Sequence, residues 1–183
     1  MTSPATVGGS GRPRLFLALR LPDGTADALA RWQRAHLGRG RVVPRDNLHV
    51  TLAFLGARPA GELPGIAGEL RAAAVAAERP VLRVERYRET RSAGMLVLED
   101  DRGRAGALAA DVQERLERLG VYRREARPWL PHVTVVRYRE RPRLGPPLPD
   151  LGEVSPSEAA VYHSVLRPTG AQYEVVESVA LGG

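Results

Sequence analysis

The chain has 183 residues, of which 43% are hydrophobic, which suits one compact domain or two fused lobes that share a core. It contains no cysteine, which excludes disulfides, thiolate metal ligands and cysteine nucleophiles and fits a cytoplasmic location. The net charge is +6 and all 27 basic residues are arginine, a side chain that makes bidentate contacts to phosphate, so the composition is compatible with an anionic partner.

The apolar runs and the N-terminal residues indicate how the chain is organised into domains. No apolar stretch approaches the roughly 20 residues that a membrane span needs, and no signal peptide is visible. Residues 1–13 are small, polar and rich in glycine and proline, and we expect them to form a disordered tail. Residues 14–183 are predicted to form a single domain.

Apolar spacing and turn residues predict the elements in chain order. The first half is predicted to run as a strand over 14–20, a helix over 25–37, a basic loop, the strand LHVTLAFLG ending at Gly56, and an alanine-rich helix over 66–78. The second half is predicted to run as strands over 81–87 and 94–98, a helix over 104–119, the strand PWLPHVTVVRY, a proline-rich loop over 139–152, and strands over 158–166 and 172–180.

The order of these elements repeats. A strand, a helix, an arginine-containing loop and a His-Val-Thr strand follow one another from residue 14, and the same order begins again at residue 94. Identity between the halves is slight outside the tripeptide, so the order of the elements is what favours an internal duplication.

Strand parity brings a histidine and a threonine together in each copy, because residues two apart on a strand face the same way. His49 and Thr51 share one face of the first strand, and His132 and Thr134 share one face of the second. The opposite face of the first strand is wholly apolar and is predicted to lie in the core: Leu48, Val50, Leu52 and Phe54.

Two imidazoles and two hydroxyls around a small anion suit displacement at a cyclic phosphodiester. Histidines with a pKa of about 6.5 can supply both the base that activates water and the acid that protonates the leaving oxygen. Each such proton transfer contributes roughly 10²–10⁴-fold to the rate. Threonine hydroxyls can donate hydrogen bonds to the phosphate oxygens, and this chemistry needs no metal or other cofactor.

Longer motifs extend this pattern. RLFLALRLP, RVVPRDNLHVTLAFLG, RPWLPHVTVVR and VYHSVLRPTGAQYEVVESVAL together resemble the 2H phosphoesterase superfamily, and within it the RNA 2′,3′-cyclic phosphodiesterases, also called the 2′–5′ RNA ligase family. The resemblance covers residues 14–181. It implies an α+β, bilobal fold, with two antiparallel sheets related by a pseudo-twofold axis, helices on the outer faces and the active-site groove between the lobes.

The resemblance also implies roles for individual residues. Hydrolysis of RNA 2′,3′-cyclic phosphate ends or of cyclic nucleotides would use His49 as proton donor and His132 as proton acceptor, and Thr51 and Thr134 would bind phosphate. Arg137 matches an arginine of the second motif, although parity places it opposite His132, so it reaches the groove only if the strand bends or ends there. A basic position before the first motif corresponds to Arg41. We expect no metal, no membrane and no partner subunit.

Other polar and aromatic residues have simpler explanations. His36 lies near a predicted helix end and is expected to be solvated or to cap the helix, and His163 is expected to be structural. Asp100 and Asp101 precede a helix, so N-capping explains at least one of them better than metal binding. The aromatic side chains of Trp129 and Phe16 are expected in the core, with the alternative that one of them lines the groove.

Two other functions stay open at this point. The same histidines could join a 2′,3′-cyclic end to a 5′ hydroxyl, as a 2′–5′ RNA ligase does on cleaved tRNA halves. The fold could also be a non-catalytic RNA- or nucleotide-binding module, although a pure binder has no need for two titratable groups in matching places.

Overall fold

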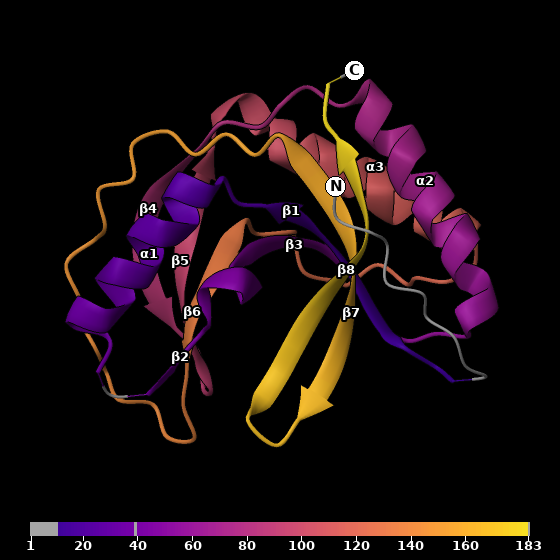
Figure 1. Cartoon of the computed structure of the whole chain (residues 1–183). Helices are drawn as coiled ribbons and strands as arrows, with labels where there is room; N and C mark the ends of the chain where they lie inside the picture. Colours follow the sequence, from indigo (N-terminus) through magenta and orange to yellow (C-terminus); the bar gives the residue numbers. More distant parts are fainter. Residues whose placement is uncertain (1–10, 39, 183) are drawn as a thin grey trace.

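A computed structural model describes residues 11–38 and 40–182, and the tail predicted over residues 1–13 lies largely outside them. The elements in chain order are β1 (Arg14–Arg20), α1 (Asp23–His36), β2 (Arg41–Val42), η1 (Arg45–Asn47), β3 (His49–Ala57), η2 (Ala60–Glu62), α2 (Leu63–Ala76), β4 (Leu82–Glu89), β5 (Ala93–Asp100), η3 (Asp101–Gly103), α3 (Arg104–Arg118), β6 (His132–Arg137), β7 (Glu158–Arg167) and β8 (Gly170–Ala180). Figure 1 shows them as two sheets that diverge from a common line, with the helices outside.

Each sheet has four strands. The first sheet has the order β3-β1-β7-β8 and the second has the order β2-β6-β5-β4. All strand pairs within them are antiparallel. The α+β, two-sheet fold is therefore confirmed, and the strand pairs β1–β3 and β5–β6 are the two copies of the predicted repeat.

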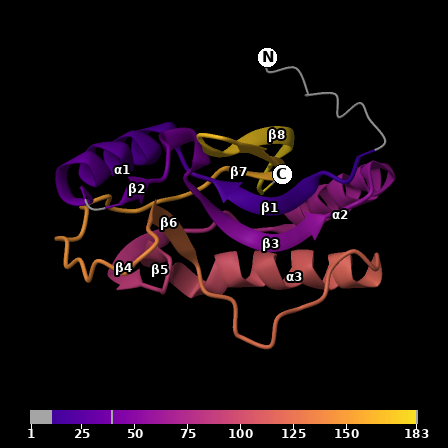
Figure 2. The same cartoon turned by 90° about the horizontal axis from the view of Figure 1, so that it is seen from below.

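The helices connect the two halves. Helix α1 follows β1 of the first sheet, yet its buried Gln33 reaches β6 of the second sheet. Helix α3 follows β5 of the second sheet, yet its buried Gln113 reaches β3 of the first. Figure 2 shows α1 and α3 on opposite sides of the molecule. Each repeat therefore packs its helix against the His-Val-Thr strand of the other repeat.

One hydrophobic cluster joins the two sheets. It contains side chains from both, among them Leu17 of β1, Leu96 of β5 and Val133 of β6, all at most 2% exposed. Burying a large aliphatic side chain contributes roughly 1.5–3 kcal/mol, so this shared core holds the sheets at a fixed angle. A smaller cluster of Phe16, Ala18, Ala160 and Tyr162 lies on the other face of the first sheet.

The predicted elements are found, with shifts of a few residues at their ends. Two differences are larger. The loop predicted between residues 38 and 48 contains the short strand β2 and the 3₁₀ turn η1. The strand predicted from Pro128 begins only at His132, because Pro131 lacks the N–H that a ladder requires. None of the helices in the described part of the chain is long and apolar enough to cross a membrane.

Candidate active site

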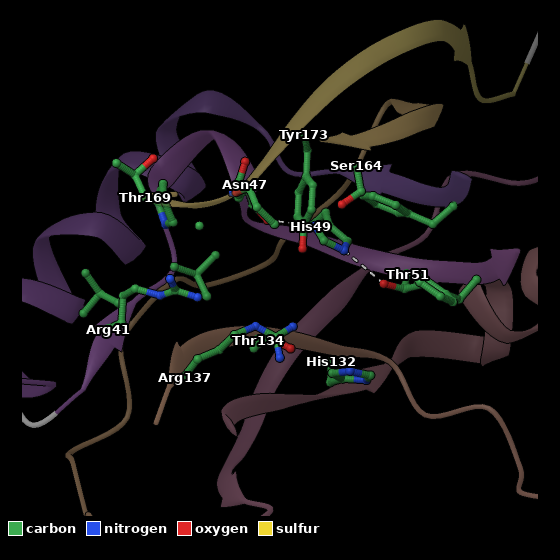
Figure 3. Close-up of a pocket in the computed structure, with 17 residues that line it drawn as sticks. Arg41, Asn47, His49, Thr51, His132, Thr134, Arg137, Ser164, Thr169 and Tyr173 are labelled. Carbon is green, nitrogen blue, oxygen red and sulfur yellow. Dashed lines mark hydrogen bonds between the residues drawn. The ribbon is translucent and has the colours of Figure 1, made fainter. Parts of the chain in front are cut away.

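A groove with a volume of about 410 Å³ separates the two sheets. Pockets of this size hold small molecules and nucleotides. The side chains of the first sheet and those of the second face one another across it, as Figure 3 shows. Its polar lining consists of Arg41, Asn47, His49, Thr51, His132, Thr134, Arg137, Ser164, Thr169 and Tyr173. All six residues predicted for the site thus line one groove.

The two histidines have the same orientation. The Nδ1 atom of His49 lies 2.7 Å from the carbonyl oxygen of Asn47, and that of His132 lies 2.8 Å from the carbonyl oxygen of Leu130. A carbonyl oxygen only accepts hydrogen bonds, so Nδ1 carries the proton and donates it in both rings. In the neutral imidazole Nε2 is then the basic atom. The Nε2 atom of His49 lies 3.0 Å from Thr51 Oγ1 (Figure 3).

A β-bulge follows the His-x-Thr pair in both strands. In β3, Ala53 pairs with Leu17 and Thr51 with Ala18, so Leu52 has no partner in β1. In β6, Val136 pairs with Gly94 and Thr134 with Met95, so Val135 has no partner in β5. Each bulge sits three residues after its histidine.

The bulges reverse strand parity, because each adds one residue to its strand. Two consecutive residues face the core in each strand, Leu52 with Ala53 and Val135 with Val136. The fifth residue after each histidine then turns into the groove. That residue is Arg137 in β6, which simple alternation had placed on the opposite face.

The same reversal corrects one prediction. Phe54 is the fifth residue after His49, and it was predicted to lie in the core. Instead it is 52% exposed and lines the groove, and the Arg14 guanidinium carbon lies 5.7 Å from its ring centre. The two repeats therefore present different side chains at equivalent positions, an aromatic ring from β3 and a guanidinium from β6.

Buried glutamines hold both bulges. Gln33 Nε2 donates to the carbonyl oxygen of Val135 at 2.7 Å, and Gln113 Nε2 donates to that of Leu52 at 2.9 Å. The two side chains are 2% and 7% exposed. A bulged carbonyl in the core costs about 1–3 kcal/mol if it stays unsatisfied, so each amide supports the strand conformation that aims the groove residues. Sequence reasoning did not identify these two positions.

Aromatic rings surround His49. The Phe16 and Tyr173 ring centres lie 4.8 and 5.5 Å from that of His49, and Tyr162 stacks on Phe16. Phe16 is thus both a core residue and part of the groove wall, as the alternative prediction stated. Trp129 packs against the main hydrophobic cluster, and its Nε1 donates to the carbonyl oxygen of Thr51 at 2.9 Å.

These surroundings make His49 hard to protonate. Its pKa is lowered from 6.5 to about 4, mainly because the packed rings desolvate it, with a smaller contribution from Coulombic repulsion by His132 and Arg137. The hydrogen bond to the Asn47 carbonyl acts in the opposite direction, since it favours the protonated ring. His49 is therefore neutral near pH ~7 while the groove is empty. An anion beside it would offset the positive charge of Arg137.

Asn47 positions the first histidine and a distant hairpin together. Its backbone carbonyl orients His49, and its side-chain Nδ2 donates to the carbonyl oxygen of Ala171 at 2.9 Å. Ser164 and Tyr173, from the two strands of that hairpin, line the groove. The motif resemblance contained these side chains but assigned them no role.

The remaining candidates lie outside the groove. His36 ends α1 and is exposed, and His163 on β7 does not line the groove. Asp100 caps α3, where it accepts hydrogen bonds from the backbone N–H groups of Ala105 and Gly106 at 3.0 and 2.7 Å. Among residues 11–38 and 40–182, no three histidine or carboxylate side chains are grouped as metal ligands.

Similar proteins were found at the level of both sequence and structure. Residues 19–93 match the LigT-like phosphoesterase family. An RNA 2′,3′-cyclic phosphodiesterase of Thermus thermophilus is 34% identical over an alignment of 188 positions, which covers 93% of this chain and 91% of that protein. A protein of the same name from Methanocaldococcus jannaschii is 24% identical over 173 residues, or 90% of this chain and 98% of the relative.

Two solved structures share the fold. Apo E. coli LigT superposes with a TM-score of 0.80 at 24% identity, over 95% of this chain and all of that chain. A solved structure from Thermus thermophilus superposes with a TM-score of 0.76 at 32% identity, over 93% of this chain and 98% of that chain. The bilobal arrangement is therefore common to these proteins.

Proposed function

Because the chain belongs to the LigT-like phosphoesterase family, we propose that it hydrolyses the 2′,3′-cyclic phosphate at the end of an RNA chain and leaves a 2′-phosphate. The observation that carries this proposal is the matched pair of histidines. Both have Nδ1 bonded to a carbonyl two residues earlier, and each has a threonine on its own face of the groove. The relatives named RNA 2′,3′-cyclic phosphodiesterases support the choice of substrate.

The two histidines act as acid and base. His132 Nε2 accepts a proton from water as the water oxygen attacks phosphorus. The bond between phosphorus and the ribose 3′ oxygen breaks, and that oxygen takes a proton from His49 Nε2. The product carries a 3′ hydroxyl and a 2′-phosphate; His49 has lost one proton and His132 has gained one. Exchange with solvent then restores both rings.

Phosphate binding prepares His49 for this role. The low pKa of about 4 means that Nε2 of His49 carries no proton in the free protein near pH ~7. A bound phosphate opposes the positive charge of Arg137, so it raises the pKa of His49 and favours uptake of the proton. A buried imidazolium is a strong acid, and it transfers its proton readily to a leaving alkoxide.

Hydroxyl and guanidinium groups stabilise the transferred phosphate. Thr51 and Thr134 donate to its non-bridging oxygens, and the bulge in β6 brings Arg137 to the same groove. Preorganised donors of this kind typically contribute about 2.7–4 kcal/mol each to the transition state. The groove lining, as far as the chain is described, contains no carboxylate. We expect the reaction to proceed without a metal ion.

Turnover of an RNA oligonucleotide with a 2′,3′-cyclic end tests the proposal. The expected product is the 2′-phosphate, identified by its ³¹P resonance, and it forms equally in EDTA. A 3′-phosphate product would contradict the assigned leaving group. Loss of activity in EDTA that a divalent ion restores would contradict metal-free chemistry. A dominant joined product with a second RNA carrying a 5′ hydroxyl would replace hydrolysis by ligation.

A further inference from the structure

Two arginines lie directly opposite each other at one end of the groove. Arg41 of β2 and Arg137 of β6 are partners in the antiparallel ladder, and both side chains line the groove. Like charges directly across a strand pair destabilise the pairing. Within the described chain neither arginine has a carboxylate within ion-pair distance, whereas the nearby Arg45 contacts three aspartates. The positive charge of these two arginines is therefore available to an anion that enters the groove.

The backbone of the opposite lobe makes room for Arg41. Gly170, at the tip of the β7–β8 hairpin, has φ of +125°, and a Cβ atom placed on it would lie 2.9 Å from Arg41 Nη1. The missing Cβ lets the guanidinium approach the backbone closely, and the positive φ also favours glycine here. The hydrogen bond from Asn47 to Ala171 ties the same hairpin tip to η1. Arg41 therefore reaches from the second sheet to the hairpin of the first.

The two arginines serve different parts of the groove. Arg137 is one of the charges that lower the pKa of His49, so its field reaches the reacting centre. Figure 3 shows Arg41 farther from His132 than Arg137 is, at the same end of the groove as Thr169. A guanidinium presents a planar fork that matches a phosphate group.

We infer that Arg41, together with the β7–β8 hairpin tip, is a second phosphate subsite, which binds the phosphodiester on the 5′ side of the cyclic nucleotide. This inference rests on the proposed function, because the reacting phosphate must occupy the histidine pair. It makes the protein selective for the end of an RNA chain over a free cyclic nucleotide. One charge-assisted contact is worth on the order of tenfold in kcat/KM.

Three substrates separate the contribution of the phosphate on the 5′ side from those of the cyclic nucleotide and of the upstream nucleoside. They are adenosine 2′,3′-cyclic phosphate, the same compound with a 5′-phosphate, and the dinucleotide ApA with a 2′,3′-cyclic end. The wild-type protein is expected to favour both phosphate-bearing substrates by about tenfold over the first. This advantage falls with added salt, with a logarithmic slope of about −0.7 for one contact to a single strand.

Variants locate the subsite. In Arg41→Ala the ratio of kcat/KM between substrates is expected to fall to about one, and Arg41→Lys keeps part of it because the charge remains without the fork. Arg123→Ala is the matched control, since it removes an exposed arginine that does not line the groove, and it keeps the wild-type ratio. The ratio is taken within one preparation, so partial unfolding does not imitate the result.

The possible outcomes separate the inference from the proposed function. A wild-type ratio of one, or an unchanged ratio in Arg41→Ala, overturns the second subsite while hydrolysis of the cyclic nucleotide stands. An advantage for the dinucleotide alone, without one for the 5′-phosphorylated nucleotide, assigns the selectivity to the upstream nucleoside and also overturns it. Failure to hydrolyse any of the three substrates overturns the proposed function itself.

Discussion

The desolvated ring of His49 predicts a specific loss of stability in acid. Its pKa is about 4 in the folded protein and 6.5 in the unfolded chain, so the unfolded chain binds a proton that the folded protein excludes between these values. Stability is complete above pH ~6.5 and falls as the pH drops toward ~4. At about 1.36 kcal/mol per pKa unit, the full loss is about 3 kcal/mol, of which about 2 kcal/mol has appeared by pH ~5.

Urea unfolding of the wild type and of His49→Asn at pH ~7.5 and pH ~5 measures this loss. Because asparagine does not titrate, the free energy of unfolding should fall by about 2 kcal/mol less in the variant than in the wild type. His36→Asn is the matched control and is expected to keep the wild-type difference, since it removes an exposed imidazole that does not line the groove. The contrary result is that the free energy of unfolding of His49→Asn and that of the wild type fall equally between the two pH values. In that case the surroundings of His49 do not hold its ring neutral, and the low pKa assigned to it is wrong.

Three further predictions concern the scaffold of the site. Gln113→Met leaves the Leu52 carbonyl without its hydrogen-bond donor, so the free energy of unfolding should fall by about 1–3 kcal/mol. Turnover of a cyclic nucleotide should fall as well, and unchanged turnover would show that the bulge in β3 does not need the amide. Gly94→Ala places a Cβ atom against the Tyr87 hydroxyl and 2.7 Å from Val136 Cγ1, opposite the bulge in β6, and should cost about 1–3 kcal/mol in urea unfolding. A neutral effect would mean that the strand and the Tyr87 ring relax freely. Asp100→Ala removes the acceptor at the start of α3 and should lower stability by about 1 kcal/mol with turnover retained, whereas a loss of turnover without a loss of stability would contradict a purely capping role.

Strand parity and local pattern predicted the centre of the site. His-x-Thr on a strand with an apolar reverse face places both side chains on one surface, whatever the neighbouring strands do. The repeated order of elements then placed the two strands in equivalent positions, and in the structure the four side chains line one groove. These features are local, which is why they could be predicted from the sequence.

Parity failed at the bulges, because a bulge depends on how two strands pair and alternation assumes that none occurs. It misplaced Phe54, and it placed Arg137 opposite His132 unless the strand bends or ends there. A signal was present in both strands, since Leu52-Ala53 and Val135-Val136 are apolar pairs that interrupt an alternating pattern. Such a pair after a His-x-Thr motif indicates that the next residue faces the site.

Residues that support the site from other elements were harder to identify. Gln33 and Gln113 each stand among the apolar positions of a helix, where a polar side chain needs a partner. The partner in each case is a carbonyl of the other repeat, more than 60 residues away along the chain, so the sequence could indicate that a partner exists but not which one. Asn47 connects the first motif to the C-terminal hairpin through a contact of the same kind.

The central claim is that two histidines carry one proton transfer each, and single-turnover hydrolysis of a cyclic-ended RNA by His49→Asn and His132→Asn tests it most directly. Each substitution should lower the rate by about 10²–10⁴-fold, and the double variant should be only slightly slower than either single one, because the two groups act in one concerted step. Circular dichroism of the same samples establishes that both variants are folded. Hydrolysis at the wild-type rate by either folded variant would contradict the account.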